Sequence, residues 1–274
     1  GGVLTRKEMT EDSFARRTIE GPLARIPENA GPILVVTAAG AIRADRLAGL
    51  LEARLDLPAG SGTEDRSAPT VAENVLAVHD ADLSQLQLIL CGPAPAETHE
   101  DRPALQLLTD ILGGGMSSRL FQSVREEAGL AYTVQAYSEH FADSGLSSIY
   151  LAVSPKRGRE AVERTLDEVR AFLRGGLKDG ELEAAKAQAR GGMIMGQESL
   201  TTRMSRLARI EFSKGVLEDL DTSLLEFERV SAADIHRVAE TWLDPSGFPV
   251  ALGPARKESL AGKDFGRVLE TGTA

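Results

Sequence analysis

The sequence predicts an α+β fold in which helices pack on one face of a mostly antiparallel sheet. Apolar runs of strand length occur in two pairs, each pair is joined by a short polar turn, and segments with helical periodicity follow. The predicted strands are 74–78, 83–90, 131–137 and 146–153, and a last apolar run at 248–252 closes the unit.

Two helices are expected between the strand pairs, and several long ones after the second pair. The start of the last helix is well marked, because Ser231 and Asp234 have the spacing of a capping box. The predicted helices are 103–112, 119–127, 159–173, 179–213 with interruptions, 217–227 and 232–243.

The first part of the chain has a different organisation. Residues 33–36 predict a buried strand and 42–54 an amphipathic helix, whereas 61–70 are small, polar and proline-bearing, as is typical of a linker. The expected division is 1–60 as the end of an N-terminal α+β half, 61–70 as the linker, 71–255 as a C-terminal α+β half and 256–274 as a tail.

Composition excludes some classes of function. The net charge is −10 and the pI about 5.1, so the basic surface needed to bind nucleic acid is lacking. No apolar run reaches about 18 residues, so no membrane span is expected. The N-terminal residues show no signal-peptide pattern, which favours the cytoplasm. The single cysteine, Cys91, lies in an apolar run and is expected to be a buried structural thiol.

The histidines predict no metal site in this chain. None of the four has a second histidine at i+4, as a helical zinc pair requires. The segment nearest to an inverted zinc motif, Ala136-Tyr137-Ser138-Glu139-His140, has alanine at the first ligand position. It also alternates like a strand rather than a helix, whereas two ligands at i and i+4 must share a helical face to converge on one ion. No cofactor is therefore expected within the chain.

Three consecutive glycines, Gly113, Gly114 and Gly115, follow the helix predicted at 103–112. No lysine follows them where a phosphate loop needs one. One glycine is explained by a left-handed helix cap, with Ser117 or Ser118 capping the next helix. A third suggests that another backbone approaches closely or that the loop must bend. Packing and function both remain open.

Arg125 and Tyr132 lie at the end of the next predicted helix and just inside the following strand. A structural interpretation pairs Arg125 with Glu126, Glu127 or a helix end and packs Tyr132 in the sheet. A functional interpretation directs both side chains toward one point. The residues around the pair favour the second interpretation.

The segment LGGGMSSRLFQSVREEAGLAYTV, residues 112–134, resembles the signature of the C-terminal half of pitrilysin/insulinase-type zinc peptidases, which include the mitochondrial processing peptidases. A looser resemblance extends over 71–254, and residues 31–60 resemble the end of the N-terminal half in that family. The resemblance implies one half of a clamshell-shaped α+β protein that closes around a peptide.

The resemblance also implies roles. Tyr132 would donate a hydrogen bond to the substrate carbonyl as charge develops on it, Arg125 would hold the peptide backbone, and Gly113, Gly114 and Gly115 would line the substrate site. The family's zinc helix has no counterpart in this chain, so zinc is expected in a partner half. The expected partners are a peptide substrate and a zinc-bearing homologous half or subunit, with a homodimer or larger homo-oligomer also open.

Two further functions remain open at this stage. The chain can be a non-catalytic core or assembly subunit that keeps the peptidase fold, or an α+β binding module unrelated to peptidases. An open polar groove at Arg125 and Tyr132 would favour the peptidase half, whereas a groove filled by a loop or partner would favour the assembly subunit.

Overall fold

In a computed structural model, the chain divides into two compact units. The first unit comprises residues 1–67 and 190–225, and the second comprises 68–189 and 226–274. The structure describes residues 4–9, 13–18, 36–54, 76–77, 84–216, 218–243 and 250–252.

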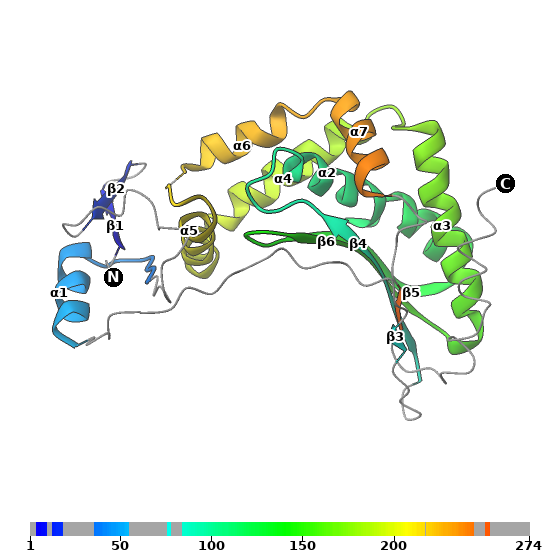
Figure 1. The fold of residues 1–274 in the computed structure, drawn as a ribbon, viewed down its shortest axis with the longest axis horizontal. Helices are drawn as coiled ribbons and strands as arrows, with labels where there is room; N and C mark the ends of the chain where they lie inside the picture. The colour runs from blue at the N-terminus through cyan, green and yellow to red at the C-terminus, as the bar shows by residue number, and fades with distance from the viewer. Residues whose placement is uncertain are drawn as a thin grey trace. The chain divides into compact units, whose positions relative to one another are not determined.

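A five-stranded sheet lies at the centre of the second unit, in the order β3-β7-β4-β6-β5 (Figure 1). The long strands β4, β6 and β5 pair antiparallel, and only the short β3 and β7 pair parallel. This arrangement confirms the predicted α+β fold. The strands are β3 Leu76–Ala77, β4 Leu86–Ala94, β5 Ala131–His140, β6 Gly145–Val153 and β7 Val250–Leu252.

Among the described residues, helices account for most of the rest of the chain. The segment predicted as a helix at 119–127 is mainly a π-helix, η1. The helices of the sheet unit, including two that continue into the first unit, are α2 Arg102–Gly113, η1 Phe121–Glu127, η2 Pro155–Arg157, α3 Gly158–Gly175, α4 Glu181–Gly196, α6 Leu220–Glu228 and α7 Ala232–Trp242.

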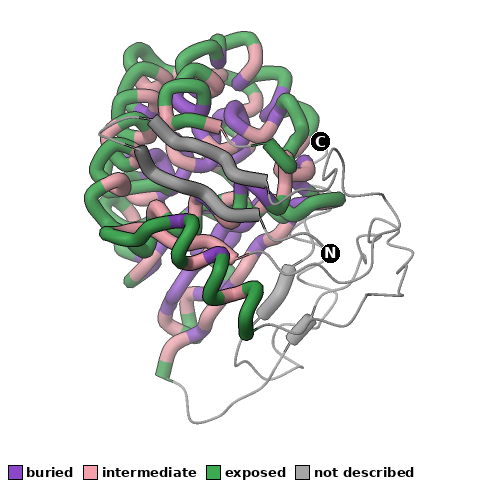
Figure 2. The backbone as a smooth tube through the Cα atoms, turned by 90° about the vertical axis from the view of Figure 1, so that its left-hand side faces the viewer, coloured by how far each residue is buried: buried purple, intermediate pink, exposed green. Residues whose placement is uncertain are grey.

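Helices cover one face of the sheet because alternate strand residues on that face are apolar. Leu86, Leu88 and Leu90 of β4 are almost fully buried, and so are Leu151 and Val153 of β6. Helix α2 packs on β5, α3 on β6 and α7 on β4. Along these helices, buried and exposed residues alternate within each turn (Figure 2), as expected of helices with one apolar face.

The opposite face of the sheet carries aromatic and amide side chains that are half-buried or exposed. Tyr137 and Gln135 of β5 are exposed there. By register they lie beside β6, where the hydroxyl of Tyr150 donates a hydrogen bond to Oε1 of Gln87. With Tyr132, these two strands hold all three tyrosines of the chain.

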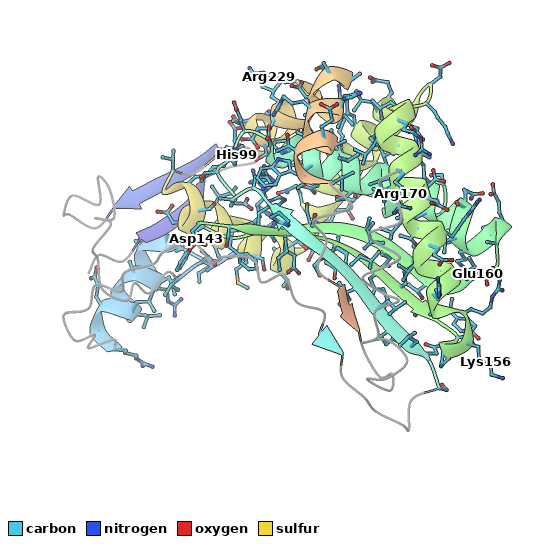
Figure 3. All side chains as sticks on the ribbon, turned by 45° about the vertical axis from the view of Figure 1, so that its right-hand side comes forward. His99, Asp143, Lys156, Glu160, Arg170 and Arg229 are labelled. Atoms are coloured by element: carbon cyan, nitrogen blue, oxygen red, sulfur yellow. The ribbon has the colours of Figure 1, made fainter. Side chains whose placement is uncertain are left out.

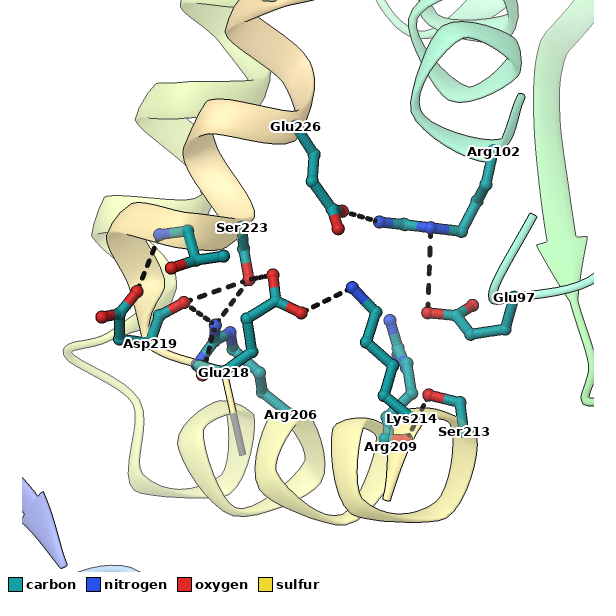
Figure 4. A network of polar contacts seen from close by, with 11 residues as sticks. Glu97, Arg102, Arg206, Arg209, Ser213, Lys214, Glu218, Asp219, Ser223 and Glu226 are labelled. Carbon is teal, nitrogen blue, oxygen red and sulfur yellow. Dashed lines mark hydrogen bonds and ion pairs between the residues drawn. The ribbon is translucent and has the colours of Figure 1, made fainter. Parts of the chain in front are cut away.

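Two charged clusters hold the N-terminal end of α2. Asp101 is buried, accepts a hydrogen bond from Nε1 of Trp242 at 3.1 Å and pairs with Arg237 at 2.6 Å, so it ties α2 to α7. Arg102 lies between Glu97 and Glu226 (Figure 4), at 4.0 and 2.7 Å. By contrast, Lys156 and Glu160 at the start of α3 are exposed (Figure 3).

The first unit contains α1 Ala44–Arg54, α5 Leu200–Lys214 and a hairpin of β1 Leu4–Met9 and β2 Ser13–Thr18. Arg206 of α5 donates hydrogen bonds to the carbonyl oxygens of Glu218 and Asp219 and to the hydroxyl of Ser223 (Figure 4). One guanidinium therefore holds the turn that precedes α6.

Several sequence expectations need correction or lie outside the described residues. The hairpin was not expected from the polar first thirty residues, and Val36, predicted as the end of a strand, belongs to none. Residues 33–35 and 248–249 are not described. Cys91 is half-buried rather than buried, and Ser148 donates a hydrogen bond to its sulfur. Within the described ranges, no helix has the length and apolar character to cross a membrane.

Arg119 is the best-satisfied buried charge of the sheet unit. Its Nε and Nη2 donate to the two carboxylate oxygens of Glu181 at 2.8 and 2.6 Å, and Nη2 also donates to the carbonyl of Gly176. The guanidinium lies over the ring of Phe172. Burial raises the pKa of Glu181, but the hydrogen bonds from Arg119 and Lys178 outweigh it and hold that pKa below its usual value.

Arg119→Ala is expected to lower the free energy of unfolding by about 3 kcal/mol, because it leaves the Glu181 carboxylate partly buried without its partner. Urea denaturation measures the change. Arg164→Ala is the matched control, since its pair with Glu127 is exposed and should be worth less than about 1 kcal/mol. Equal losses of unfolding free energy in the two variants would show that the buried pair of Arg119 and Glu181 stabilises the fold no more than an exposed pair does.

Candidate functional site

The glycine run connects α2 to η1 and starts from a tight contact with the sheet. Gly113 is buried in the last turn of α2, and a Cβ atom there would lie 2.2 Å from the backbone nitrogen of Ala136 in β5. Only a glycine lets α2 approach β5 this closely. The close backbone approach that a third glycine suggested is therefore present, at Gly113.

The other two glycines are exposed and lie on the surface of the loop. Gly114 ends α2 with a φ of −81°, and its N–H donates to the carbonyl of Asp110 at 2.8 Å. None of the three glycines has a positive φ, so the expected left-handed cap is wrong. Ser118 does not cap the next helix either, because its hydroxyl donates back to the carbonyl of Gly115.

Asp110 lies one turn before this loop. Burial raises the pKa of its carboxyl to about 6. A carboxylate oxygen of Asp110 would lie 2.8 Å from a Cβ atom at Gly114, so the carboxyl borders the loop directly.

The segment after the loop places Arg125. Helix η1 has the wider π geometry, which is rare and occurs often at functional sites. Its end is closed by backbone hydrogen bonds: the N–H groups of Ala128 and Gly129 both donate to the carbonyl of Arg125, and that of Leu130 to the carbonyl of Val124. Gly129 has a φ of +57°, which a residue without Cβ adopts without strain.

The same turn leads directly into β5 and places Tyr132. A bulge lies between Ala131 and Thr133, so Tyr132 is an extra residue against the β6 register. Tyr132 is 59% exposed. Bulges redirect side chains, and this one presents the phenol of Tyr132 to solvent at the start of the strand.

Arg125 is held mainly by an aromatic ring. Its guanidinium carbon lies 4.7 Å from the centre of the Phe121 ring, and its Nε lies 3.7 Å from a carboxylate oxygen of Glu126. The side chain is 43% exposed. The structural pairing with Glu126 is present but longer than a hydrogen bond, and no hydrogen bond from the Arg125 guanidinium to another described residue is found.

The described residues offer no set of metal ligands. No group of three or more His, Cys, Asp or Glu side chains gathers within the described ranges. The ring nitrogens of His140 lie at the carbonyl of Pro95 and the hydroxyl of Ser138, and His99 contacts Asp101 and Trp242. These histidines do not fit a zinc site. His79 lies outside the described residues.

Sequence reasoning named Arg125, Tyr132 and the three glycines but missed two neighbours that shape their surroundings. Phe121 stands four residues before Arg125, a spacing that places side chains together on helices. Asp110 stands four residues before Gly114, and its burial depends on tertiary packing. The spacing of Phe121 and Arg125 could be read from the sequence, whereas the burial of Asp110 could not.

The chain has an α+β fold in which helices cover one face of the sheet, and its glycine loop leads to a segment with Arg125 and Tyr132. These features are typical of one half of a two-half peptidase of the pitrilysin type. The chain belongs to the peptidase M16 family, since the family model described as "Peptidase M16 inactive domain" matches residues 30–189. This confirms the resemblance to the C-terminal half of pitrilysin-type peptidases.

The curated relatives carry the name uncharacterized zinc protease. One from Mycobacterium tuberculosis is 38% identical over 180 residues, which are 65% of this chain and 41% of that protein. Another, from Bacillus subtilis, is 35% identical over 141 residues, 52% of this chain and 34% of that protein. The chain therefore matches less than half the length of these relatives.

Solved structures share the fold. The peptidase M16 inactive domain from Pseudomonas fluorescens aligns with a TM-score of 0.64 and 22% identity over 77% of this chain and 51% of that one. A chain of Complex III2 from Candida albicans aligns with a TM-score of 0.72 and 17% identity over 84% of this chain and 56% of that one. At these identities the likeness concerns the fold alone.

Gly113→Ala is expected to destabilise the protein by about 1–3 kcal/mol, because the methyl group forces α2 away from β5. Chemical denaturation measures this loss. Gly115→Ala is the matched control, since a Cβ atom there would meet only Oε1 of Gln188 at 3.9 Å. An unchanged Gly113→Ala protein would show that α2 and β5 do not depend on this contact.

Asp110→Asn is expected to raise the melting temperature at pH 8 and to change it little at pH 4. The folded-state pKa of about 6 lies above the ordinary 3.8, so the unfolded chain releases the proton first as the pH rises. The free energy of unfolding that the Asp110 carboxyl contributes is therefore lost as the pH rises from 3.8 to about 6, and asparagine, which does not ionise, avoids that loss. The same shift of melting temperature at both pH values would contradict burial as its origin.

Proposed function

We propose that this chain is the non-zinc half of a peptidase M16 enzyme that binds peptide and assists its hydrolysis by a zinc-bearing homologous half. One observation carries the proposal. A backbone turn closed by several hydrogen bonds presents Arg125 and Tyr132 from one continuous segment, and both residues are exposed.

The two side chains suit different tasks. The phenol of Tyr132 can donate a hydrogen bond to a peptide carbonyl oxygen, and this bond strengthens as negative charge develops on that oxygen. The guanidinium of Arg125 can donate to carbonyl oxygens of bound peptide and of the transition state alike. Gly114 and Gly115, which are exposed, are proposed to contact the peptide backbone, whereas Gly113 is occupied in packing.

The zinc-bearing half is proposed from two observations. The chain corresponds to 41% of a relative that is called a zinc protease, and the described histidines do not form a metal site. When bound in that other half, zinc would supply the hydrolytic chemistry. The residues of this chain hold and orient the peptide.

A second candidate is a non-catalytic assembly subunit with the same fold. A chain of Complex III2 from Candida albicans has this fold, which is compatible with either role. The exposed donors of Arg125 and Tyr132 favour the peptidase half, because an assembly role gives no reason to keep them exposed. Reconstitution with a zinc-bearing homologous half separates the two: peptidase activity that requires this chain supports the first.

In that assembled enzyme, Tyr132→Phe is expected to lower kcat by about 10²–10³-fold with little change in KM, because its hydrogen bond strengthens in the transition state. Arg125→Ala is expected to raise KM as well, since it holds substrate and transition state alike. Steady-state kinetics on a fluorogenic peptide measures both.

Tyr137→Phe is the matched control, because Tyr137 is another exposed tyrosine of β5 and should leave kcat unchanged. Full activity of the Tyr132 and Arg125 variants, with any loss confined to thermal stability, would assign the pair a structural role. The peptidase proposal would then fail.

A further inference from the structure

Arg119 and Arg125, which lie in one continuous segment, differ in how many protein acceptors their guanidinium groups have. Arg119 directs its hydrogen-bond donors into the protein, toward both oxygens of Glu181 and the carbonyl of Gly176. Arg125, six residues later, has no comparable acceptor among the described residues: its contacts there are the ring of Phe121 and one carboxylate oxygen at 3.7 Å. The first arginine stabilises the fold, and the second has donors left for a ligand.

A ring face holds a guanidinium without occupying its donors. The five N–H groups lie in the guanidinium plane, so a guanidinium that stacks flat on an aromatic ring keeps them free for other acceptors. A carboxylate partner would orient Arg125 as well, but it would consume the in-plane donors that grip a carbonyl oxygen. Phe121 therefore restrains Arg125 while its N–H groups remain available.

The backbone that carries Phe121 and Arg125 is held at both ends of η1. Phe121 follows the buried Leu120 and is itself half-buried, so the ring is supported by the protein. At the other end, the carbonyl of Arg125 accepts the N–H groups of Ala128 and Gly129. Because the backbone is held at both ends, the remaining conformational freedom lies in the side chain of Arg125. The ring of Phe121 restrains that side chain.

We infer that Phe121 is a positioning residue that orients the Arg125 guanidinium toward peptide carbonyl oxygens. This inference rests on the proposed function of Arg125. Phe121 itself contacts no substrate; it acts by limiting the orientations of Arg125, so its removal weakens peptide binding only through that residue.

The test is a double-mutant cycle in the enzyme assembled with its zinc-bearing half, using the KM for a fluorogenic peptide and the Kd of a non-hydrolysed analogue. Phe121→Leu is expected to weaken binding about two- to fivefold, as loss of an exposed cation–π contact implies, with little change in kcat. Phe121→Tyr should restore binding, because it keeps the ring face. In the Arg125→Ala background, Phe121→Leu should have no further effect.

Phe141→Leu is the matched control, since Phe141 is exposed in the loop between β5 and β6 and should leave binding unchanged. If Arg125→Ala alone leaves binding unchanged, the proposed function fails. If Arg125→Ala weakens binding but Phe121→Leu does not, or does so equally without Arg125, the positioning role of Phe121 is overturned while the function of Arg125 stands.

Discussion

The backbone of β5 lies so close to the last turn of α2 that residue 113 has no room for a side chain. This contact decides where the surrounding elements lie. It fixes the C-terminal end of α2 against the sheet, and the glycine loop leaves from that point toward η1 and the turn that opens β5. The candidate site is therefore built on two elements held in direct backbone contact, rather than on a loop placed by side chains alone.

Two arginines six residues apart, Arg119 and Arg125, differ in how far the protein satisfies their charge. Arg119 is enclosed by Glu181, Gly176 and Phe172, so a charge that would be costly to bury has nearly all its partners inside the protein. Arg125 combines a ring contact with a long ion pair and stays partly in water. The two arginines differ because their surroundings, not the side chain itself, decide which hydrogen-bond donors have partners within the protein.

The two faces of the sheet differ for the same reason. Leucine and valine at alternate positions of β4 and β6 direct the helices to one face. The other face keeps the half-buried or exposed amide and phenol groups of Gln87, Gln135, Tyr137 and Tyr150. One alternation along the strands thus supplies both the core and the polar face next to Tyr132.

Hydrophobic periodicity and the segment 112–134 are local signals, so the fold class, the family, and the long strands and helices of the C-terminal half to within a few residues could be predicted from the sequence. Three properties became visible only in the folded chain: Gly113 is a packing residue, Tyr132 stands in a bulge, and Arg119 is buried while Arg125 is exposed. The physical reason is that these properties depend on partners distant in the chain: Ala136 for Gly113, the β6 register for Tyr132, and Glu181 for Arg119. No local pattern of residues contains those contacts.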